Sequence, residues 1–281
     1  MKPPPGPPAP GTSSGPPGTV LRLQRTGPAS DLPSITAMLR VLDDVERARA
    51  GLTADAAQAA SFIAGRYLLR CLVADVLGIR AGRPVSCFEC PACGPTGVPD
   101  HGRPTYLLDG ERVPLALSLS RADGFVLLGA LGASTTAWSS GPAGTAGLSG
   151  LSGLSGLSGA VRTPRRARTP SSHTARSPSR PGLGVDLAAV AAVDFEGFDD
   201  VALTPGERTM VDGLGSDDRK ALRARLWTRK EALVKASGTG FTDRGPDAVQ
   251  VLQERRVTDL TSIGGEALEP LGLVAAVAVD P

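Results

Sequence analysis

The sequence predicts an α+β fold, because two long helical segments are combined with several short apolar segments typical of strands. The long helices are expected over about residues 54–77 and 217–237. The strands are too few and too short for a large sheet, but they are enough to complete a small antiparallel one. The expected strands are 125–131, 184–187, 248–252 and 273–279.

Local signals define the ends of the first helix. Thr53 is a typical N-cap residue, and Gly78 is suited to the left-handed conformation that ends many helices. Between them, apolar residues recur at three- and four-residue spacing, which indicates one buried face. The residues expected to point inward are Ile63, Tyr67, Leu68, Cys71 and Leu72.

Two further helices are expected in the C-terminal part. Thr204-Pro205-Gly206-Glu207 is a capping box with proline at the first helical position, which predicts a short helix ending near Gly213. Ser216 is expected to cap the long second helix, with Asp217 and Asp218 placed favourably at its positive end. Gly238 is expected to terminate it.

The second long helix carries the most informative pattern in the chain. Trp227, Glu231 and Lys235 follow one another at four-residue spacing and therefore lie on one face. Three of the four lysines of the chain, Lys220, Lys230 and Lys235, fall on this helix, which favours a role for compact positive charge such as phosphate binding. The alternative is that Glu231 and Lys235 form only an exposed ion pair on the helix surface, which would stabilise the helix by about 0.3 kcal/mol.

The segment 227–240 resembles the signature W-x-x-K-E-A-x-x-K-x-x-G-x-G of the 4'-phosphopantetheinyl transferase superfamily, and within it the type that activates surfactin synthetase. Upstream, Gly184-Val185-Asp186-Leu187 is similar to the companion motif G-[IV]-D-[LIV]. Taken alone, that tetrapeptide would indicate only a turn aspartate at the end of a strand. The signature positions that match are Trp227, Lys230, Glu231, Ala232, Lys235, Gly238 and Gly240.

The resemblance implies transfer of the phosphopantetheinyl group of coenzyme A to a serine of an acyl or peptidyl carrier protein, with release of 3',5'-ADP. It implies Mg²⁺ held by Asp186 and Glu231, because hard oxygen ligands together with substrate phosphates suit this ion. Glu231 and Lys235 are the implied catalytic residues, with Glu231 or a metal-bound water as the base, and Lys230 and Lys235 are the implied phosphate contacts. The carrier would serve polyketide, nonribosomal peptide or fatty acid biosynthesis.

Looser similarity to the superfamily covers residues 40–131. Gly102-Arg103-Pro104 matches a G-[KR]-P motif, so Arg103 is implied as a coenzyme A ligand, although the tripeptide alone would mean only a turn. Leu117–Ala122 occupies the place of [FL]-[SN]-[LI]-S-H-S, where Ser120 fits and Arg121 replaces the usual histidine. A guanidinium at Arg121 can still bind phosphate. The resemblance also implies two pseudo-symmetric halves, each a long helix on a small antiparallel sheet, with coenzyme A between them.

A second departure from the superfamily's pattern concerns the metal. The surfactin-activating type usually has G-[IV]-D-[LI]-E, whereas this chain has Ala188 in place of the glutamate. Water can fill such a position on Mg²⁺. Ala188 and Arg121 together leave an alternative function open: a degenerate, non-catalytic protein that binds coenzyme A or a carrier protein.

The composition of the chain argues against some other classes of function. The 281 residues carry a formal net charge of +2, so no general attraction to nucleic acid or membranes is expected. No apolar run has membrane-spanning length and no signal peptide is evident, which predicts a cytoplasmic protein. Two halves in one chain predict a monomer. The expected organisation is a disordered tail at 1–18, an N-terminal half at 19–131, an insertion at 132–181 and a C-terminal half at 182–281.

The predicted insertion has low complexity. It contains four Leu-Ser-Gly triplets and then six arginines with no acidic residue between them, and such a segment cannot bury enough apolar surface to order. It separates strands 125–131 and 184–187, which members of the superfamily join by a short turn, and we expect it at the tip of a hairpin. The arginines leave a polyanion-binding role open as a further alternative.

One cysteine-rich segment remains outside the resemblance. Cys87, Cys90, Cys93 and His101 form C-x2-C-x2-C-x7-H, which supplies four ligands of the type that structural zinc uses. The alternative is a loop of unpaired thiols.

Overall fold

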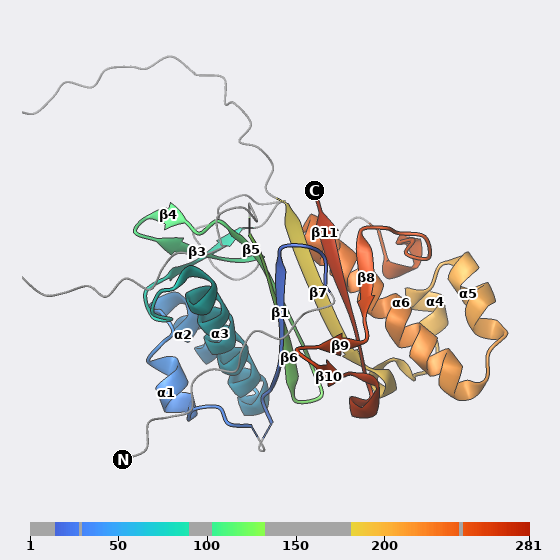
Figure 1. Ribbon diagram of the computed structural model, residues 1–281. Helices are drawn as coiled ribbons and strands as arrows, with labels where there is room; N and C mark the ends of the chain where they lie inside the picture. The colour runs from blue at the N-terminus through green and yellow to red at the C-terminus, as the bar shows by residue number, and fades with distance from the viewer. Residues whose placement is uncertain (1–14, 28–29, 90–102, 133–180, 242–243) are drawn as a thin grey trace, which may run out of the picture. The chain divides into compact units, whose positions relative to one another are not determined.

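The computed structural model describes residues 15–27, 30–89, 103–132, 181–241 and 244–281 (Figure 1). The elements in chain order are β1 (Thr19–Arg25), α1 (Ile35–Leu39), α2 (Asp44–Gly51), α3 (Ala56–Leu77), β2 (Val85–Glu89), β3 (Arg103–Leu108), β4 (Glu111–Arg112), β5 (Leu115–Ala122), β6 (Phe125–Gly132), β7 (Gly182–Ala189), α4 (Phe198–Ala202), α5 (Pro205–Asp212), α6 (Ser216–Ser237), β8 (Val257–Leu260), β9 (Ser262–Ile263), β10 (Glu266–Ala267) and β11 (Leu273–Asp280), with short 3-10 turns at Val190–Val193, Pro246–Ala248 and Glu269–Leu271.

The N-terminal part is built on an antiparallel sheet in the order β1-β6-β5. Helix α3 packs on β5 and β6, and the buried residues Leu69 and Leu72 of α3 join Val126 and Leu128 of β6 in one core. The helix ends at Gly78, whose φ of 65° is the left-handed conformation expected there. Its N-cap is Asp55, not Thr53, because the Asp55 carboxylate accepts the hydrogen bond from the Gln58 backbone N–H.

The C-terminal part is built on a second antiparallel sheet in the order β7-β11-β8. Helix α6 lies along β7 and β11, as Figure 1 shows. It ends at Gly238 as expected, but Gly215 is its N-cap and Ser216 is its first residue. The capping box of Thr204 and Glu207 at the start of α5 is confirmed in both of its hydrogen bonds.

A smaller sheet in the order β2-β3-β4 and the helices α1 and α2 complete the N-terminal part. Here Arg70 of α3 is fully buried and forms ion pairs with Glu46 of α2 and Asp43. The Tyr106 hydroxyl of β3 also donates to Glu46, so a buried polar network fixes α2, α3 and β3 to one another.

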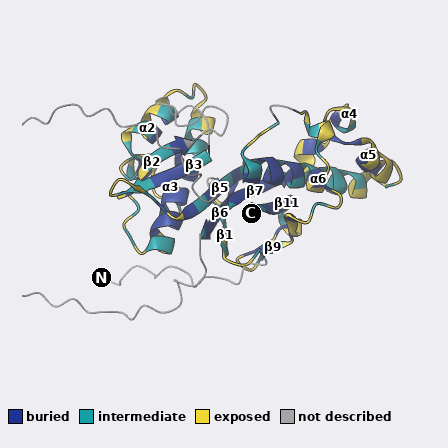
Figure 2. Cartoon of the chain, turned by 90° about the horizontal axis from the view of Figure 1, so that it is seen from above, coloured by how far each residue is buried: buried dark blue, intermediate teal, exposed yellow. Residues whose placement is uncertain are grey.

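The two larger sheets meet where β5 lies beside β7, and this junction positions the candidate site. The Val185 backbone N–H of β7 donates to the Ser118 hydroxyl of β5 at 2.9 Å. Gly129 of β6 also packs directly against Val185. Figure 2 shows β5, β6 and β7 as largely buried, which agrees with a continuous core beneath the junction.

The expected hairpin of β6 and β7 is wrong. β6 pairs with β1 and β5, whereas β7 pairs with β11, so the two strands belong to different sheets. They are neighbours through side-chain packing and not through a ladder of backbone hydrogen bonds. The chain therefore crosses from one sheet to the other between these strands.

The expected strand at 248–252 is also wrong. Ala248 ends a 3-10 turn, and the residues after it form no strand. A side chain takes the place of a neighbouring strand here: the Arg229 guanidinium of α6 donates a hydrogen bond to the Val251 backbone carbonyl at 2.8 Å. The strand that pairs with β11 on this edge is β8, which begins at Val257.

These elements confirm the α+β class, since helices and small antiparallel sheets are both present. Two-fold symmetry between the parts and the domain boundaries remain predictions. The predicted tail at 1–18 and insertion at 132–181 lie almost entirely outside the described residues. Within the part of the chain that the structure describes, no helix is long and apolar enough to cross a membrane.

Candidate active site

Four side chains singled out in the sequence meet where β5, β7 and α6 come together. The Asp186 carboxylate of β7 accepts hydrogen bonds at Oδ1 from the Lys235 ammonium at 2.5 Å and from the Ser120 hydroxyl at 2.7 Å. Lys235 Nζ lies 3.7 Å from Glu231 Oε2. The structure therefore brings together Asp186, Glu231, Lys235 and Ser120, which we call the carboxylate–lysine group.

Glycines in β7 allow α6 to approach this closely. A Cβ atom at Gly184 would overlap the carbonyl oxygen of Ala232, and one at Gly182 would overlap that of Ala236. Since Glu231 and Lys235 flank Ala232 on α6, this contact sets how far their side chains lie from Asp186. Only glycine fits so close a helix–strand contact.

Burial shapes the electrostatics of the group. The Asp186 side chain is 6% exposed and that of Glu231 is 24% exposed. Desolvation raises the pKa of Asp186, and the Lys235 ammonium and the Ser120 hydroxyl oppose that rise. Burial also raises the pKa of Glu231, Lys235 opposes it, and the charge of Asp186 adds to it. Two partly desolvated carboxylates at one place favour a cation between them.

The donor set of this group fits a divalent cation that prefers oxygen. Asp186 and Glu231 supply carboxylates from two rigid elements, and Mg²⁺ needs only one or two such ligands when water and substrate phosphates complete its shell. Among the described residues there is no cluster of three or more His, Cys, Asp or Glu side chains arranged to hold a metal ion. Ala188, where the resemblance implies a third carboxylate, lies one residue beyond Leu187 on β7 and is 7% exposed.

Arg103 begins β3 and reaches the end of α6. Its Nη2 donates to the Ala236 carbonyl at 2.7 Å, and its guanidinium packs against Gly238, where a Cβ atom would collide with it. Arg103 Nε is buried without a hydrogen-bond partner, and burial lowers the pKa of this guanidinium. Arg103 therefore caps the helix that carries Glu231 and Lys235, and it retains one unsatisfied donor.

Arg121 belongs to a group of guanidiniums that the sequence reasoning missed. It donates from Nε to the Ser61 carbonyl at 3.1 Å, and its charge lies over the Phe62 ring, as does that of Arg66. Arg49 stacks on the same ring. Burial, with the charges of Arg66 and Arg49, lowers the pKa of Arg121 to about 10, which still leaves it charged at neutral pH.

Arg49, Arg66 and Arg121 form an arginine group, and two of its members, Arg66 and Arg121, have buried donors without partners. Arg66 is 6% exposed, and its Nε and Nη1 donate to no partner, nor does Arg121 Nη2. Buried cations side by side with unsatisfied donors are costly unless an anion joins them. Arg66 lies within the long helix expected from the sequence, and no local sequence pattern signals this role.

The structure does not bring Lys230 to the carboxylate–lysine group. Its side chain is fully buried, and its ammonium contacts Glu207 Oε2 at 2.7 Å and the Pro246 carbonyl at 2.8 Å. Burial lowers the pKa of Lys230, and the Glu207 partner opposes that effect. A buried and paired ammonium is not available to an incoming phosphate, so Lys230 has a structural role in this arrangement.

Three of the four predicted zinc ligands, Cys90, Cys93 and His101, lie outside the described residues. Cys87 lies on β2 as a free, partly buried cysteine. The zinc site therefore remains a prediction from spacing.

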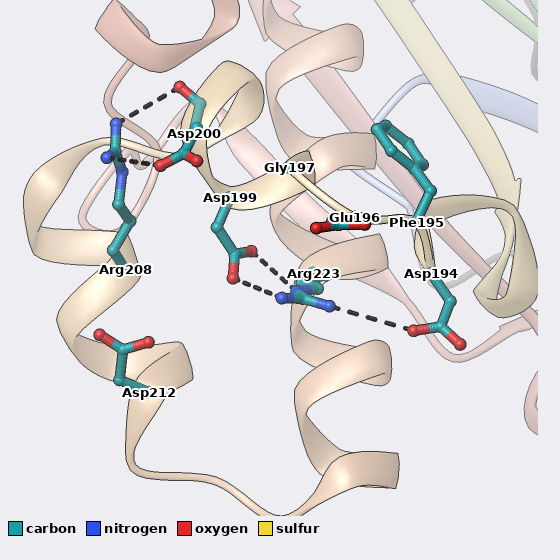
Figure 3. Close-up of a pocket in the computed structure, with 9 residues that line it drawn as sticks. All are labelled: Asp194, Phe195, Glu196, Gly197, Asp199, Asp200, Arg208, Asp212 and Arg223. Atoms are coloured by element: carbon teal, nitrogen blue, oxygen red, sulfur yellow. Dashed lines mark hydrogen bonds and ion pairs between the residues drawn. The ribbon is translucent and has the colours of Figure 1, made fainter.

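A cavity of about 580 Å³ lies elsewhere, between α4, α5 and α6 (Figure 3). Five acidic side chains and only two arginines line it, so it is unfavourable for the phosphates of a nucleotide. Its arginines are paired: Arg223 bonds Asp199 and lies near Asp194, and Arg208 bonds Asp200, as the dashed lines in Figure 3 mark. No residue of the carboxylate–lysine group lines this cavity.

Two carboxylates and a lysine held on a strand and a helix define a site suited to a cation and to phosphate. The sequence comparison agrees with that reading: residues 182–268 match the family model of the 4'-phosphopantetheinyl transferase superfamily, and the chain carries a domain of this superfamily. Asp186, Glu231 and Lys235 fall within the matched residues, whereas Arg103, Ser120 and Arg121 precede them. No curated protein sequence gave a significant match to the chain.

Proposed function

We propose that the protein transfers the 4'-phosphopantetheinyl group of coenzyme A to a serine hydroxyl of an acyl or peptidyl carrier protein. The observation that carries this proposal is the meeting of Asp186, Glu231 and Lys235 within the matched domain, with Ser120 contributed from the other sheet. In the reaction the serine oxygen bonds to phosphorus, the bond from phosphorus to 3',5'-ADP breaks, and the serine proton passes to a base.

Each residue of the group has a part in this scheme. Asp186 and Glu231 would hold Mg²⁺, which when bound supplies positive charge to the pyrophosphate of coenzyme A. Glu231, directly or through a water, is the proposed base. Lys235 would bind phosphate and offset charge on the departing 3',5'-ADP. Ser120 holds the Asp186 carboxylate in its orientation.

The arginine group supplies a place for the remaining charge of the substrate. Coenzyme A carries a phosphate on its ribose as well as a pyrophosphate, and Arg66 and Arg121 have buried donors that lack partners. Ser120 and Arg121 are adjacent on β5, so one strand links the arginine group to the carboxylate–lysine group. We propose that Arg121, with Arg66 and Arg49, binds this second phosphate. Arg103 is proposed as a further coenzyme A ligand through its unsatisfied Nε.

The experiment is intact-mass analysis of a panel of apo carrier proteins after incubation with this protein, coenzyme A and Mg²⁺, with and without a chelator. A chelator-sensitive gain of one phosphopantetheinyl group supports the proposal and ranks the carriers of the polyketide, peptide and fatty acid types. Asp186→Asn is the inactive comparison, and Asp109→Asn, which alters an exposed ion pair with Arg83, is its matched control. If coenzyme A binds and no carrier gains mass, the degenerate binding protein is the better description.

A further inference from the structure

The ammonium of Lys235 lies where a cation shared by Asp186 and Glu231 would bind. Its Nζ is 2.5 Å from Asp186 Oδ1 and 3.7 Å from Glu231 Oε2. The same Asp186 oxygen also accepts the Ser120 hydroxyl, so two donors already occupy it. In this structure the protein therefore supplies the positive charge that the two desolvated carboxylates require.

A second cation at these carboxylates would meet the Lys235 ammonium at close range. Like charges in a partly desolvated site repel more strongly than in water. The Arg103 guanidinium near this end of α6 does not replace the ammonium, because it faces the Ala236 carbonyl and not the carboxylates. The ammonium and a divalent cation are therefore alternatives at Asp186.

Lys235 is able to leave, whereas Lys230 on the same helix is not. The Lys235 side chain is 31% exposed and lies in the last turn of α6, two residues before the helix ends. Lys230 is fully buried and held by Glu207 and Pro246. A flexible four-carbon stem at a partly exposed helix end can move its ammonium by several ångströms without disturbing the fold.

We propose that Lys235 is an internal counter-ion that competes with the divalent cation for Asp186, and that this competition couples binding of the cation to binding of coenzyme A. The inference rests on the function proposed above. A phosphate group that accepts the Lys235 ammonium removes it from Asp186, so coenzyme A strengthens cation binding. By linkage the cation strengthens coenzyme A binding by the same factor.

The coupling predicts a specific binding pattern that does not depend on turnover. Mn²⁺ serves as the probe, since the free ion is measured directly by electron paramagnetic resonance. Without coenzyme A, Lys235→Met should bind Mn²⁺ roughly tenfold more tightly than the wild type, within the usual range of coupling between sites. Coenzyme A should tighten Mn²⁺ binding to the wild type by a similar factor and should tighten binding to Lys235→Met much less.

Lys220→Met is the matched control, because Lys220 lies on the same helix and pairs with Asp194 at the surface. It should behave like the wild type. Circular dichroism and thermal melting verify that each variant is folded, and Lys235→Gln replaces Lys235→Met if the latter is not. Equal Mn²⁺ affinity in the wild type and the Lys235 variants, or weaker binding in the variants, overturns the competition and leaves the proposed transfer intact. Absence of Mn²⁺ binding in every protein, with and without coenzyme A, overturns both.

Discussion

Gly184 of β7 and Ala232 of α6 lie so close together that any side chain at position 184 would overlap the Ala232 carbonyl oxygen. This contact holds the helix carrying Glu231 and Lys235 against the strand carrying Asp186. The packing of two backbones, more than any hydrogen bond, therefore determines the geometry of the candidate site.

Gly184→Ala should destabilise the protein and reduce transfer. The added methyl group forces α6 away from β7, and overpacking of this kind costs about 1–3 kcal/mol. Urea unfolding gives the stability, and carrier modification gives the activity. Gly213→Ala is the control, because a Cβ atom there meets nothing within 4 Å and the backbone φ is −79°. Wild-type stability in Gly184→Ala would show that the helix can move without penalty.

Asp186→Asn should abolish transfer while preserving or raising stability. The folded-state pKa of Asp186 is raised by burial, so the unfolded chain ionises first and stability falls as pH rises from the unfolded pKa, about 4, toward the folded one. Asparagine removes this loss and retains an oxygen that can accept the Ser120 hydroxyl. Melting temperatures of both proteins across pH 4–8 provide the measurement. The difference should grow in favour of Asp186→Asn as pH increases, and a markedly less stable variant at neutral pH would contradict this account.

Arg121→Gln should weaken coenzyme A binding more than it slows turnover. Arg121 has an unsatisfied buried donor, and a charged hydrogen bond to phosphate contributes about 1.5–3 kcal/mol, equivalent to roughly a 10- to 100-fold rise in KM for coenzyme A. Steady-state kinetics separate KM from kcat. Arg83→Gln, at an exposed ion pair with Asp109, is the control. An unchanged KM would remove Arg121 from the proposed substrate contacts.

Lys230→Met should destabilise the fold by about 3–5 kcal/mol, because it leaves Glu207 buried without its ammonium partner. Protein that remains folded should retain its KM for coenzyme A, which distinguishes this lysine from Lys235. Adding Glu207→Gln should recover part of the lost stability, since the amide is neutral and can still accept the Thr204 backbone N–H. Urea unfolding of both variants is the measurement, and a raised KM with unchanged stability would restore Lys230 as a phosphate ligand.

Ala188→Glu should lower the Mg²⁺ concentration needed for half-maximal transfer. Positions 186 and 188 lie on the same face of β7, so the new carboxylate would be on the side of Asp186. The burial of Ala188 predicts some loss of stability, which thermal melting measures separately. An unchanged Mg²⁺ requirement in the folded variant would mean that the alanine does not limit cation binding.

Features coded by neighbouring residues could be predicted from the sequence. Gly78 and Gly238 end their helices, and Thr204 with Glu207 forms its capping box, because each depends on hydrogen bonds within a few residues. The meeting of Asp186 with Glu231 and Lys235 was expected only through the superfamily resemblance.

Features that depend on distant partners could not be predicted in this way. Strand pairing depends on what lies alongside, so 248–252 is not a strand and β6 does not form a hairpin with β7. The arginine group also depends on distant parts of the chain, since Arg121 and Arg66 meet only when β5 packs on α3. Lys230 matches the superfamily signature, yet its buried partner Glu207 comes from α5.

The hydrogen bonds from β5 to β7 have a practical consequence for dividing the chain. A fragment ending at residue 132 contains Ser118, Ser120 and the arginine group. A fragment beginning at residue 181 contains Asp186, Glu231 and Lys235. Neither fragment has a whole site, so recovery of transfer on mixing the two would report their reassembly. If each fragment were fused to one of two interacting proteins, association of those proteins would bring the fragments together, and transfer to a carrier protein would report that association.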